Sequence, residues 1–287
     1  MKTKTYPDVT YLKHVAWIAG GIMRADFSTG MKREWKSDET PLTVTDTKIN
    51  DFVVKSIARD FPEVRVIGEE ESNTIEDAEY TIFCDPVDGT IPFSLGLPIS
   101  TFCISVFEHG KPIIGVIYDP FQERMWFAER GQGSFLWQVP TFCHDPLYKE
   151  EWSDKKGDIT QVEVSKLSTI NRSNICMIWW KGSSYHLHDV CELLMDAGGH
   201  WMNPASIAIF GGLIASGTID GSIFPGKNAW ETGAMQVIVE EAGGKVTDIY
   251  GKEMFYGPKG EIEGHIISNG LIHDELVELV ARCQGVP

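Results

Sequence analysis

Residues 80–90 read YTIFCDPVDGT, an apolar segment that runs directly into two carboxylates. Tyr80–Cys84 is rich in β-branched and aromatic residues, which predicts a strand ending at Asp85-Pro86. Asp85 and Asp88 follow, three residues apart, in a predicted turn. Two ionised carboxylates this close repel each other unless a cation lies between them. Because Mg²⁺ prefers hard oxygen ligands, this strand end is a predicted metal site.

The next residues, Gly89 to Phe93, predict the start of a helix. Thr90 suits the N-cap position, and Pro92 fits the first turn, where its missing N–H costs nothing. Gly89 permits close approach of other groups to the backbone. Because free N–H groups at a helix start bind phosphate, an anion site is expected beside the carboxylates. The alternative is an Asx-rich turn without a functional role.

Two further acidic segments are weak signals when taken alone. Glu69, Glu70 and Glu71 follow the predicted strand at 64–68, and acids in such a place are usually solvated. Glu231 opens a predicted helix at 230–242, where an acid often only compensates the helix dipole. The small residues Gly233 and Ala234 would let another element approach this helix closely.

Periodicity divides the remaining chain into two parts. Residues 28–45 are predicted as a loop, and residues 138–161 as a surface segment near a domain boundary. The first part, 1–150, has two helices and a run of antiparallel strands joined in one place by His109-Gly110. The second part, 151–287, alternates strands and helices, which indicates an α/β arrangement. Helices are predicted at 8–24, 47–60, 185–197 and 207–216, and strands at 101–108, 112–118, 124–128, 133–137, 175–179, 219–224 and 245–248.

The charge and composition limit the classes of partner. With 25 basic and 41 acidic residues the net charge is −16, which argues against nucleic-acid binding. A protein so negative needs local positive charge to hold phosphate, and a metal ion supplies it compactly. The six cysteines include no C-x-x-C pair and are expected to be reduced thiols. No apolar stretch is long enough to span a membrane, and the N-terminus does not resemble a signal peptide, so a cytoplasmic location is expected.

These segments together resemble the inositol monophosphatase family, part of the Mg²⁺-dependent, lithium-sensitive phosphatase superfamily. The resemblance covers nearly the whole chain, with its motifs in the expected order. The matching motifs are G-E-E at 68–70, D-P-V-D-G-T at 85–90, the W-E-T-G-A helix start at 230–234 and E-A-G-G at 241–244. Thr43–Asp46 and Lys36 also look like an earlier motif of the family.

The resemblance implies a layered αβαβα sandwich in which the 1–150 part carries most metal ligands and the 151–287 part carries Glu231 and substrate contacts. It implies a homodimer that hydrolyses a small phosphorylated metabolite with two or three Mg²⁺ ions, Mn²⁺ being possible. By this resemblance the metal ligands are Glu69, Asp85, the carbonyl of Val87, Asp88 and Glu231. The implied catalytic residues are Asp46, Glu69 and Thr90, and the implied substrate-binding residues are Asp88, Gly89, Thr90, Ser206 and Lys227.

Two positions depart from the family pattern. Glu231 stands where aspartate is usual, and its longer side chain could weaken the second metal or favour Mn²⁺. Phe224 aligns with a glutamate of inositol-specific members, which weakens an inositol phosphate assignment. Histidinol phosphate, fructose 1,6-bisphosphate and 3′(2′),5′-bisphosphate nucleotides therefore stay open as alternative substrates to a sugar or polyol phosphate. A catalytically weak, metal-binding regulatory relative is the alternative from a different class.

Overall fold

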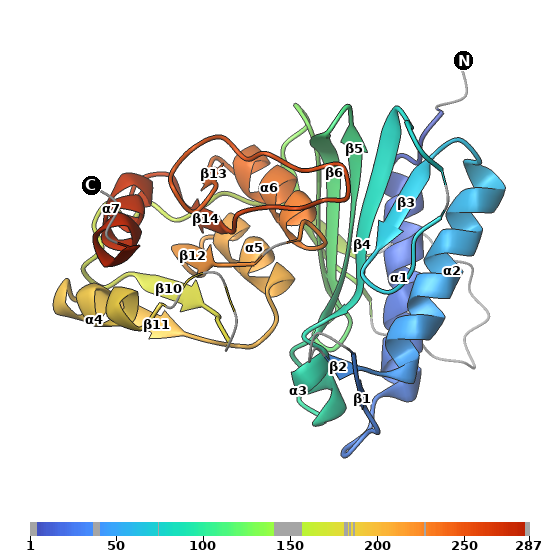
Figure 1. Ribbon diagram of the computed structural model, residues 1–287, viewed down its shortest axis with the longest axis horizontal. Helices are drawn as coiled ribbons and strands as arrows, with labels where there is room; N and C mark the ends of the chain where they lie inside the picture. Colours follow the sequence, from blue (N-terminus) through green and yellow to red (C-terminus); the bar gives the residue numbers. More distant parts are fainter. Residues whose placement is uncertain are drawn as a thin grey trace.

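The computed structural model describes residues 5–36, 41–73, 75–140, 157–180, 183, 185, 187–226 and 228–284. In this part of the chain two large sheets and the helices form five layers (Figure 1). Helices α1 (Val9–Asp26) and α2 (Val44–Asp60) cover the outer face of the first sheet. Helices α5 (Ala208–Ala215) and α6 (Thr232–Glu241) lie between the sheets, and α4 (His188–Asp196) and α7 (His273–Gln284) cover the far face of the second. The predicted αβαβα sandwich is confirmed.

The first sheet has seven strands in the order β3-β4-β5-β6-β7-β8-β9. Among the described strands of this sheet β3–β4 is the only parallel pair, so these two strands end at the same edge. The strands are β3 (Arg65–Gly68), β4 (Tyr80–Asp88), β5 (Thr101–Glu108), β6 (Lys111–Asp119), β7 (Arg124–Glu129), β8 (Ser134–Gln138) and β9 (Asp158–Gln161). Apolar side chains of α1 and α2 pack on one face of this sheet, where Leu12 and Ile49 of the helices and Ile82 of β4 are fully buried.

The second sheet is mixed, in the order β11-β10-β12-β14-β13. Strand β10 is parallel to both of its neighbours, whereas β14 is antiparallel to β12 and β13. The strands are β10 (Asn174–Met177), β11 (His200–Met202), β12 (Gly221–Phe224), β13 (Lys245–Thr247) and β14 (His265–Ser268). Among the described residues no helix is both long and apolar enough to cross a membrane.

Helix α6 packs on the first sheet at unusually small residues. A Cβ at Gly115 would lie 2.5 Å from the carbonyl oxygen of Ala234 and 2.9 Å from its Cα. A Cβ at Gly233 would lie 2.5 Å from the ring of Phe107. This matches the expectation that the small residues at 233 and 234 allow a close approach. The same packing sets the position of Glu231, the N-cap residue of α6.

We expect Gly115→Ala to destabilise the protein, because the methyl group meets backbone atoms that cannot turn away. Overpacking of this kind costs roughly 1–3 kcal/mol, which should lower the Tm by at least about 2 °C. Gly21→Ala is the control, since a Cβ there has no neighbour within 4 Å. Thermal unfolding measures both, and an unchanged Tm for Gly115→Ala would show that α6 does not depend on this contact.

Several local predictions were wrong in detail. Strand β4 continues through the D-P-V-D motif to Asp88, where a turn was expected. The N-cap of α3 (Thr90–Ser94) is Gly89 with φ 84°, a left-handed conformation that favours glycine, so Thr90 is the first helical residue. The predicted loop at 28–45 holds a small antiparallel pair, β1 (Glu34–Trp35) and β2 (Pro41–Leu42), and the start of α2. Helix α2 begins at Val44 because Thr43 and Asp46 form a capping box.

The boundary near residue 150 stays a prediction. Most of the segment 138–161, residues 141–156, lies outside the described residues. Strand β9 forms the last four residues of this segment and pairs with β8, so the first sheet extends to Gln161, where only a surface segment was predicted.

Candidate active site

Three buried carboxylates lie together where β4 ends and α6 begins. Asp85, Asp88 and Glu231 each offer a carboxylate oxygen, and these atoms all lie within 4.8 Å of one another. The three residues are only 3%, 2% and 8% exposed. Burial raises the pKa of all three, and the charges of neighbouring carboxylates raise those of Asp85 and Glu231 further. Burying three ionised carboxylates together costs free energy unless protons or cations compensate their charge.

A β-bulge brings Asp85 and Asp88 to the same face of β4. Asp85 pairs with Cys103 and Asp88 with Thr101, so three steps on β4 correspond to two on β5. Because side chains alternate along a strand, an odd spacing would normally place the two carboxylates on opposite faces. The extra residue of the bulge cancels this difference. Both carboxylates therefore point toward the layer that contains α5 and α6.

Glu69 reaches the same edge through the parallel pairing of β3 and β4. Gly68 pairs with Cys84, and the Glu69 N–H donates to the Cys84 carbonyl at 3.1 Å. The charge of Glu69 contributes to the raised pKa of Asp85. The Lys36 ammonium lies 2.9 Å from Glu69 and 2.7 Å from Glu70, and burial raises the pKa of Glu70 to about 7. The parallel pairing therefore places the acids that follow β3 beside those at the end of β4.

Asp46 and Thr90 form a pair on the other side of this edge. One oxygen of Asp46 accepts hydrogen bonds from the Thr43 N–H at 2.8 Å and from the Thr43 hydroxyl. The Thr90 hydroxyl lies 3.2 Å from the other oxygen and 3.1 Å from the Val87 carbonyl. Burial raises the pKa of Asp46 to about 6, although its hydrogen bonds with Thr43 favour the charged form. The ionised form of Asp46 can accept a hydrogen bond from the Thr90 hydroxyl.

The remaining predicted residues lie near Asp88 or outside the described chain. Gly89 sits beside the loop before α5, where an added Cβ would lie 3.0 Å from the Ala205 carbonyl oxygen. Ser206 is fully buried and its hydroxyl donates to Asp88. Lys227 lies outside the described residues.

Sequence reasoning did not single out Thr101 or the start of α5. The Thr101 hydroxyl donates to Asp88 at 2.9 Å, and the N–H groups of Ile207 and Ala208 do so at the same distance. Asp88 thus interacts with the start of α5 across 118 residues or more of sequence. Thr101 could have been found only from the register of β4 against β5, and the bulge shifts that register between Asp85 and Asp88.

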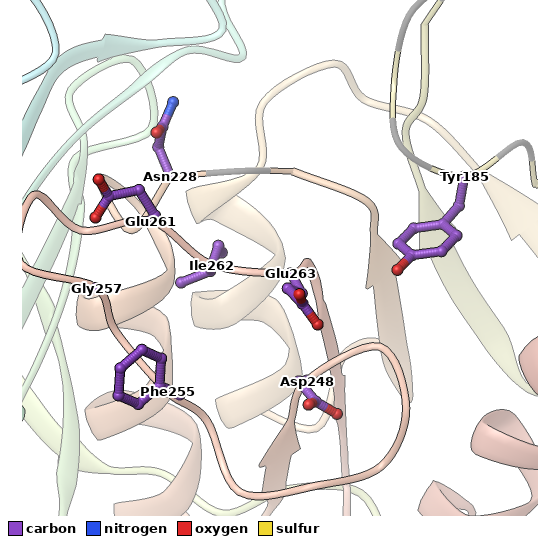
Figure 2. A pocket seen from close by; sticks show the side chains of 8 residues that line it. All are labelled: Tyr185, Asn228, Asp248, Phe255, Gly257, Glu261, Ile262 and Glu263. Atoms are coloured by element: carbon purple, nitrogen blue, oxygen red, sulfur yellow. The ribbon is translucent and has the colours of Figure 1, made fainter.

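A cavity of about 790 Å³ lies near the segment that leads into α6 (Figure 2). Its walls carry three carboxylates, from Asp248, Glu261 and Glu263, and two aromatic rings, from Tyr185 and Phe255. Asn228 completes one wall and lies three residues before Glu231. No lysine, arginine or histidine of the described chain is among the lining residues, so the cavity is suited to a cationic group.

The carboxylate cluster fits divalent metal ions. All three side chains offer hard oxygen ligands, as Mg²⁺ and Mn²⁺ prefer, and burial excludes the water that would otherwise solvate their charge. The raised pKa values show that the metal-free cluster lacks sufficient compensating charge. A bound cation would supply it.

Comparison with known proteins identifies the chain's relatives. The model of the inositol monophosphatase family matches residues 7–284. A histidinol-phosphatase of Mycobacterium tuberculosis is 28% identical over 86% of this chain and 87% of its own length. The fold of the IMPase of Thermotoga maritima superposes with a TM-score of 0.80 at 23% identity, over 97% of this chain and 99% of that one. A structure described as IMPase/NADP phosphatase complexed with Mg²⁺ and phosphate has a TM-score of 0.72 at 20% identity, over 94% and 92%. The chain belongs to the inositol monophosphatase family, whose members are metal-dependent hydrolases of phosphoric monoesters.

Proposed function

We propose that this protein hydrolyses the monoester of a small sugar, polyol or inositol phosphate with Mg²⁺. The observation that carries the proposal is the buried cluster of Asp85, Asp88 and Glu231 beside the Asp46–Thr90 pair. The cluster would hold the metal ions, together with Glu69 and the carbonyl of Val87. When bound, such ions activate water and neutralise the charge of the leaving oxygen.

The chain's own groups would position the reactants and carry a proton. Thr90 would accept a hydrogen bond from the attacking water while its own hydroxyl donates to Asp46, which needs the ionised form of Asp46. The N–H groups of Gly89 and Thr90 would hold the phosphate. Glu69, whose charge contributes to the raised pKa of Asp85, would be the third catalytic residue beside Asp46 and Thr90. Asp88, Ser206 and Lys227 would be further substrate-binding residues, and the Ser206 hydroxyl also donates a hydrogen bond to Asp88.

Phosphate release from a panel of sugar, inositol, histidinol and nucleotide phosphates, with Mg²⁺, Mn²⁺ or EDTA, tests the proposal. Turnover of a sugar or inositol phosphate that requires metal and stops with EDTA would support it. No turnover with any substrate or metal would contradict it and would favour a regulatory, metal-binding role.

We expect Glu231→Asp to stay active, within about tenfold of the parent kcat, because the carboxylate is kept and aspartate suits the family's pattern. Glu231→Gln should lose far more, since it removes a charge that faces the metals. Steady-state kinetics at saturating Mg²⁺ compares the two variants. An inactive Glu231→Asp with a parent-like Tm would show that this site is built around the longer side chain.

Histidinol phosphate is the second candidate substrate, and the acidic cavity favours it. A substrate that carries an amine and an imidazole would be attracted by Asp248, Glu261 and Glu263, whereas an inositol would not. Phe224 also argues against an inositol substrate. Its ring is buried between the rings of Trp180 and His265, and it offers no oxygen to a substrate hydroxyl. The similarity to a histidinol-phosphatase supports this candidate. A kcat/KM for histidinol phosphate at least tenfold above that for inositol phosphate would decide for it.

We also propose a homodimer in a reducing, cytoplasmic environment. The five cysteines in the described chain are all free thiols. Two apolar side chains of the edge strand β11 are exposed, Trp201 by 40% and Met202 by 36%. A second copy of the chain would cover these side chains in a dimer, which would account for their exposure in a single chain. Light scattering after size exclusion measures the mass, and a monomer at micromolar concentration would contradict the dimer.

A further inference from the structure

We propose that Thr101 and Ser206 are positioning residues that hold Asp88 so that only one of its oxygens, Oδ1, is free to bind a metal ion. The inference rests on the metal site proposed above. It adds Thr101 and gives Ser206 a second role, and both residues would act on the metal through Asp88.

The hydrogen bonds of Asp88 are distributed unequally over its two oxygens. Oδ2 accepts from the Thr101 hydroxyl and the Ala208 N–H, each at 2.9 Å, and from the Ser206 hydroxyl. Within the described chain Oδ1 accepts only from the Ile207 N–H, also at 2.9 Å. Three donors occupy the lone-pair directions of Oδ2, whereas Oδ1 keeps capacity for one more partner.

The donors are held by rigid surroundings. Thr101 lies on β5 directly opposite Asp88, and Ser206 precedes α5, whose first residue is Ala208. Both side chains are fully buried, and their hydroxyl oxygens lie 3.3 Å apart. Rotation of the Asp88 carboxylate would break several of these bonds without water to replace them, so its orientation is fixed before a metal arrives.

A fixed carboxylate with one available oxygen discriminates between metals. Mg²⁺ requires near-octahedral geometry, whereas Ca²⁺ is larger and is often bound by both oxygens of one carboxylate. For Asp88 to bind through both oxygens, Oδ2 would have to give up the Thr101 or Ser206 hydroxyl. The two hydroxyls therefore favour Mg²⁺ and Mn²⁺ over Ca²⁺ at this site.

Metal binding by the full-length protein tests the proposal directly. Electron paramagnetic resonance measures free Mn²⁺ during a titration, and added Mg²⁺ or Ca²⁺ measures displacement. Removing a group that orients a metal ligand typically costs about 10–100-fold in affinity. We expect Thr101→Val and Ser206→Ala each to raise the Kd for Mn²⁺ and Mg²⁺ by about tenfold, and to raise the Kd for Ca²⁺ less.

Two controls separate positioning from general damage. Thr101→Ser keeps the hydroxyl and should bind within about threefold of the parent, which loss of packing alone would not predict. Ser105→Ala changes a buried hydroxyl on the same strand that has no hydrogen-bond partner among the described residues, and it should bind as the parent does.

Parent-like Kd values and an unchanged Mg²⁺/Ca²⁺ ratio in both Thr101→Val and Ser206→Ala would overturn the proposal. If one of the two fails to fold, the other decides. A parent that binds no Mn²⁺ would overturn the metal site as well. A parent that binds Mn²⁺ but hydrolyses no phosphate ester would contradict the proposed function alone.

Discussion

Asp88→Asn is expected to lower kcat by at least about 100-fold. The change keeps the size of the side chain but removes a negative charge from the centre of the carboxylate cluster, where electrostatic contributions are least screened. The two oxygens of Asp88 together accept hydrogen bonds from four donors. The substitution also replaces one of these oxygens by an NH₂ group, which cannot accept them. Initial rates at saturating substrate and Mg²⁺ measure the loss.

Stability distinguishes a lost function from a lost fold. In EDTA the Asp88→Asn protein should not be much less stable than the parent, because relief from carboxylate repulsion offsets the poorer hydrogen bonds. Asp220→Asn is a matched control: Asp220 is buried, accepts hydrogen bonds from Ser165 at 2.6 Å and from the Asn174 N–H at 2.8 Å, and lies outside the cluster. It should lower the Tm and keep kcat. Near-normal turnover by Asp88→Asn would show that the metal assignment is wrong.

The metal-free protein is expected to become more stable as the pH is lowered from 8 to 6.5. Its buried carboxyls have pKa values above those of the unfolded chain, where they lie near 4. Burial raises the pKa of Glu70 to about 7 and that of Asp46 to about 6, and the pKa values of Asp85 and Glu231 are raised well above normal. A group with a raised pKa stabilises the fold when protonated, and this contribution is lost as the pH rises through the folded-state pKa.

The expected change in Tm and the pH range in which it occurs both follow from these pKa shifts. One pKa unit corresponds to about 1.4 kcal/mol, and about 1 kcal/mol moves the Tm of a chain of this size by roughly 2 °C, so a rise of at least about 4 °C is expected. Below pH 6.5 two buried histidines act in the opposite direction. Burial lowers the pKa of His265 to about 3 and that of His273 to about 4, so the unfolded chain binds protons there that the folded protein does not.

Thermal unfolding in EDTA and in saturating Mg²⁺ at each pH provides the measurement. Metal ions compete with protons for the same oxygens, so Mg²⁺ should stabilise most at pH 8 and reverse the trend. A Tm in EDTA that rises with pH across this window would mean that the cluster is not strained in the metal-free state.

The local order of residues was enough to predict much of the fold. The two strand-like runs at 101–108 and 112–118, separated by the turn signal His109-Gly110, predicted a pair of strands, and the helical spacing in 8–24 predicted α1. Such patterns are readable because each depends on neighbours a few residues away. The short strands β9, β11 and β14 and helix α7 were not predicted, and β1 and β2 were included in a predicted loop.

The sequence by itself determined the family and the chemistry of the site, because D-P-V-D-G-T places two carboxylates, a glycine and a threonine within six residues. Only the tertiary structure decided how these groups face one another. The bulge in β4 turns Asp85 and Asp88 to one side, the contact of Gly115 with Ala234 sets α6 and Glu231, and the start of α5 meets Asp88 across 118 residues or more. Each of these depends on strand register and helix packing between distant segments, which no local pattern in the sequence records.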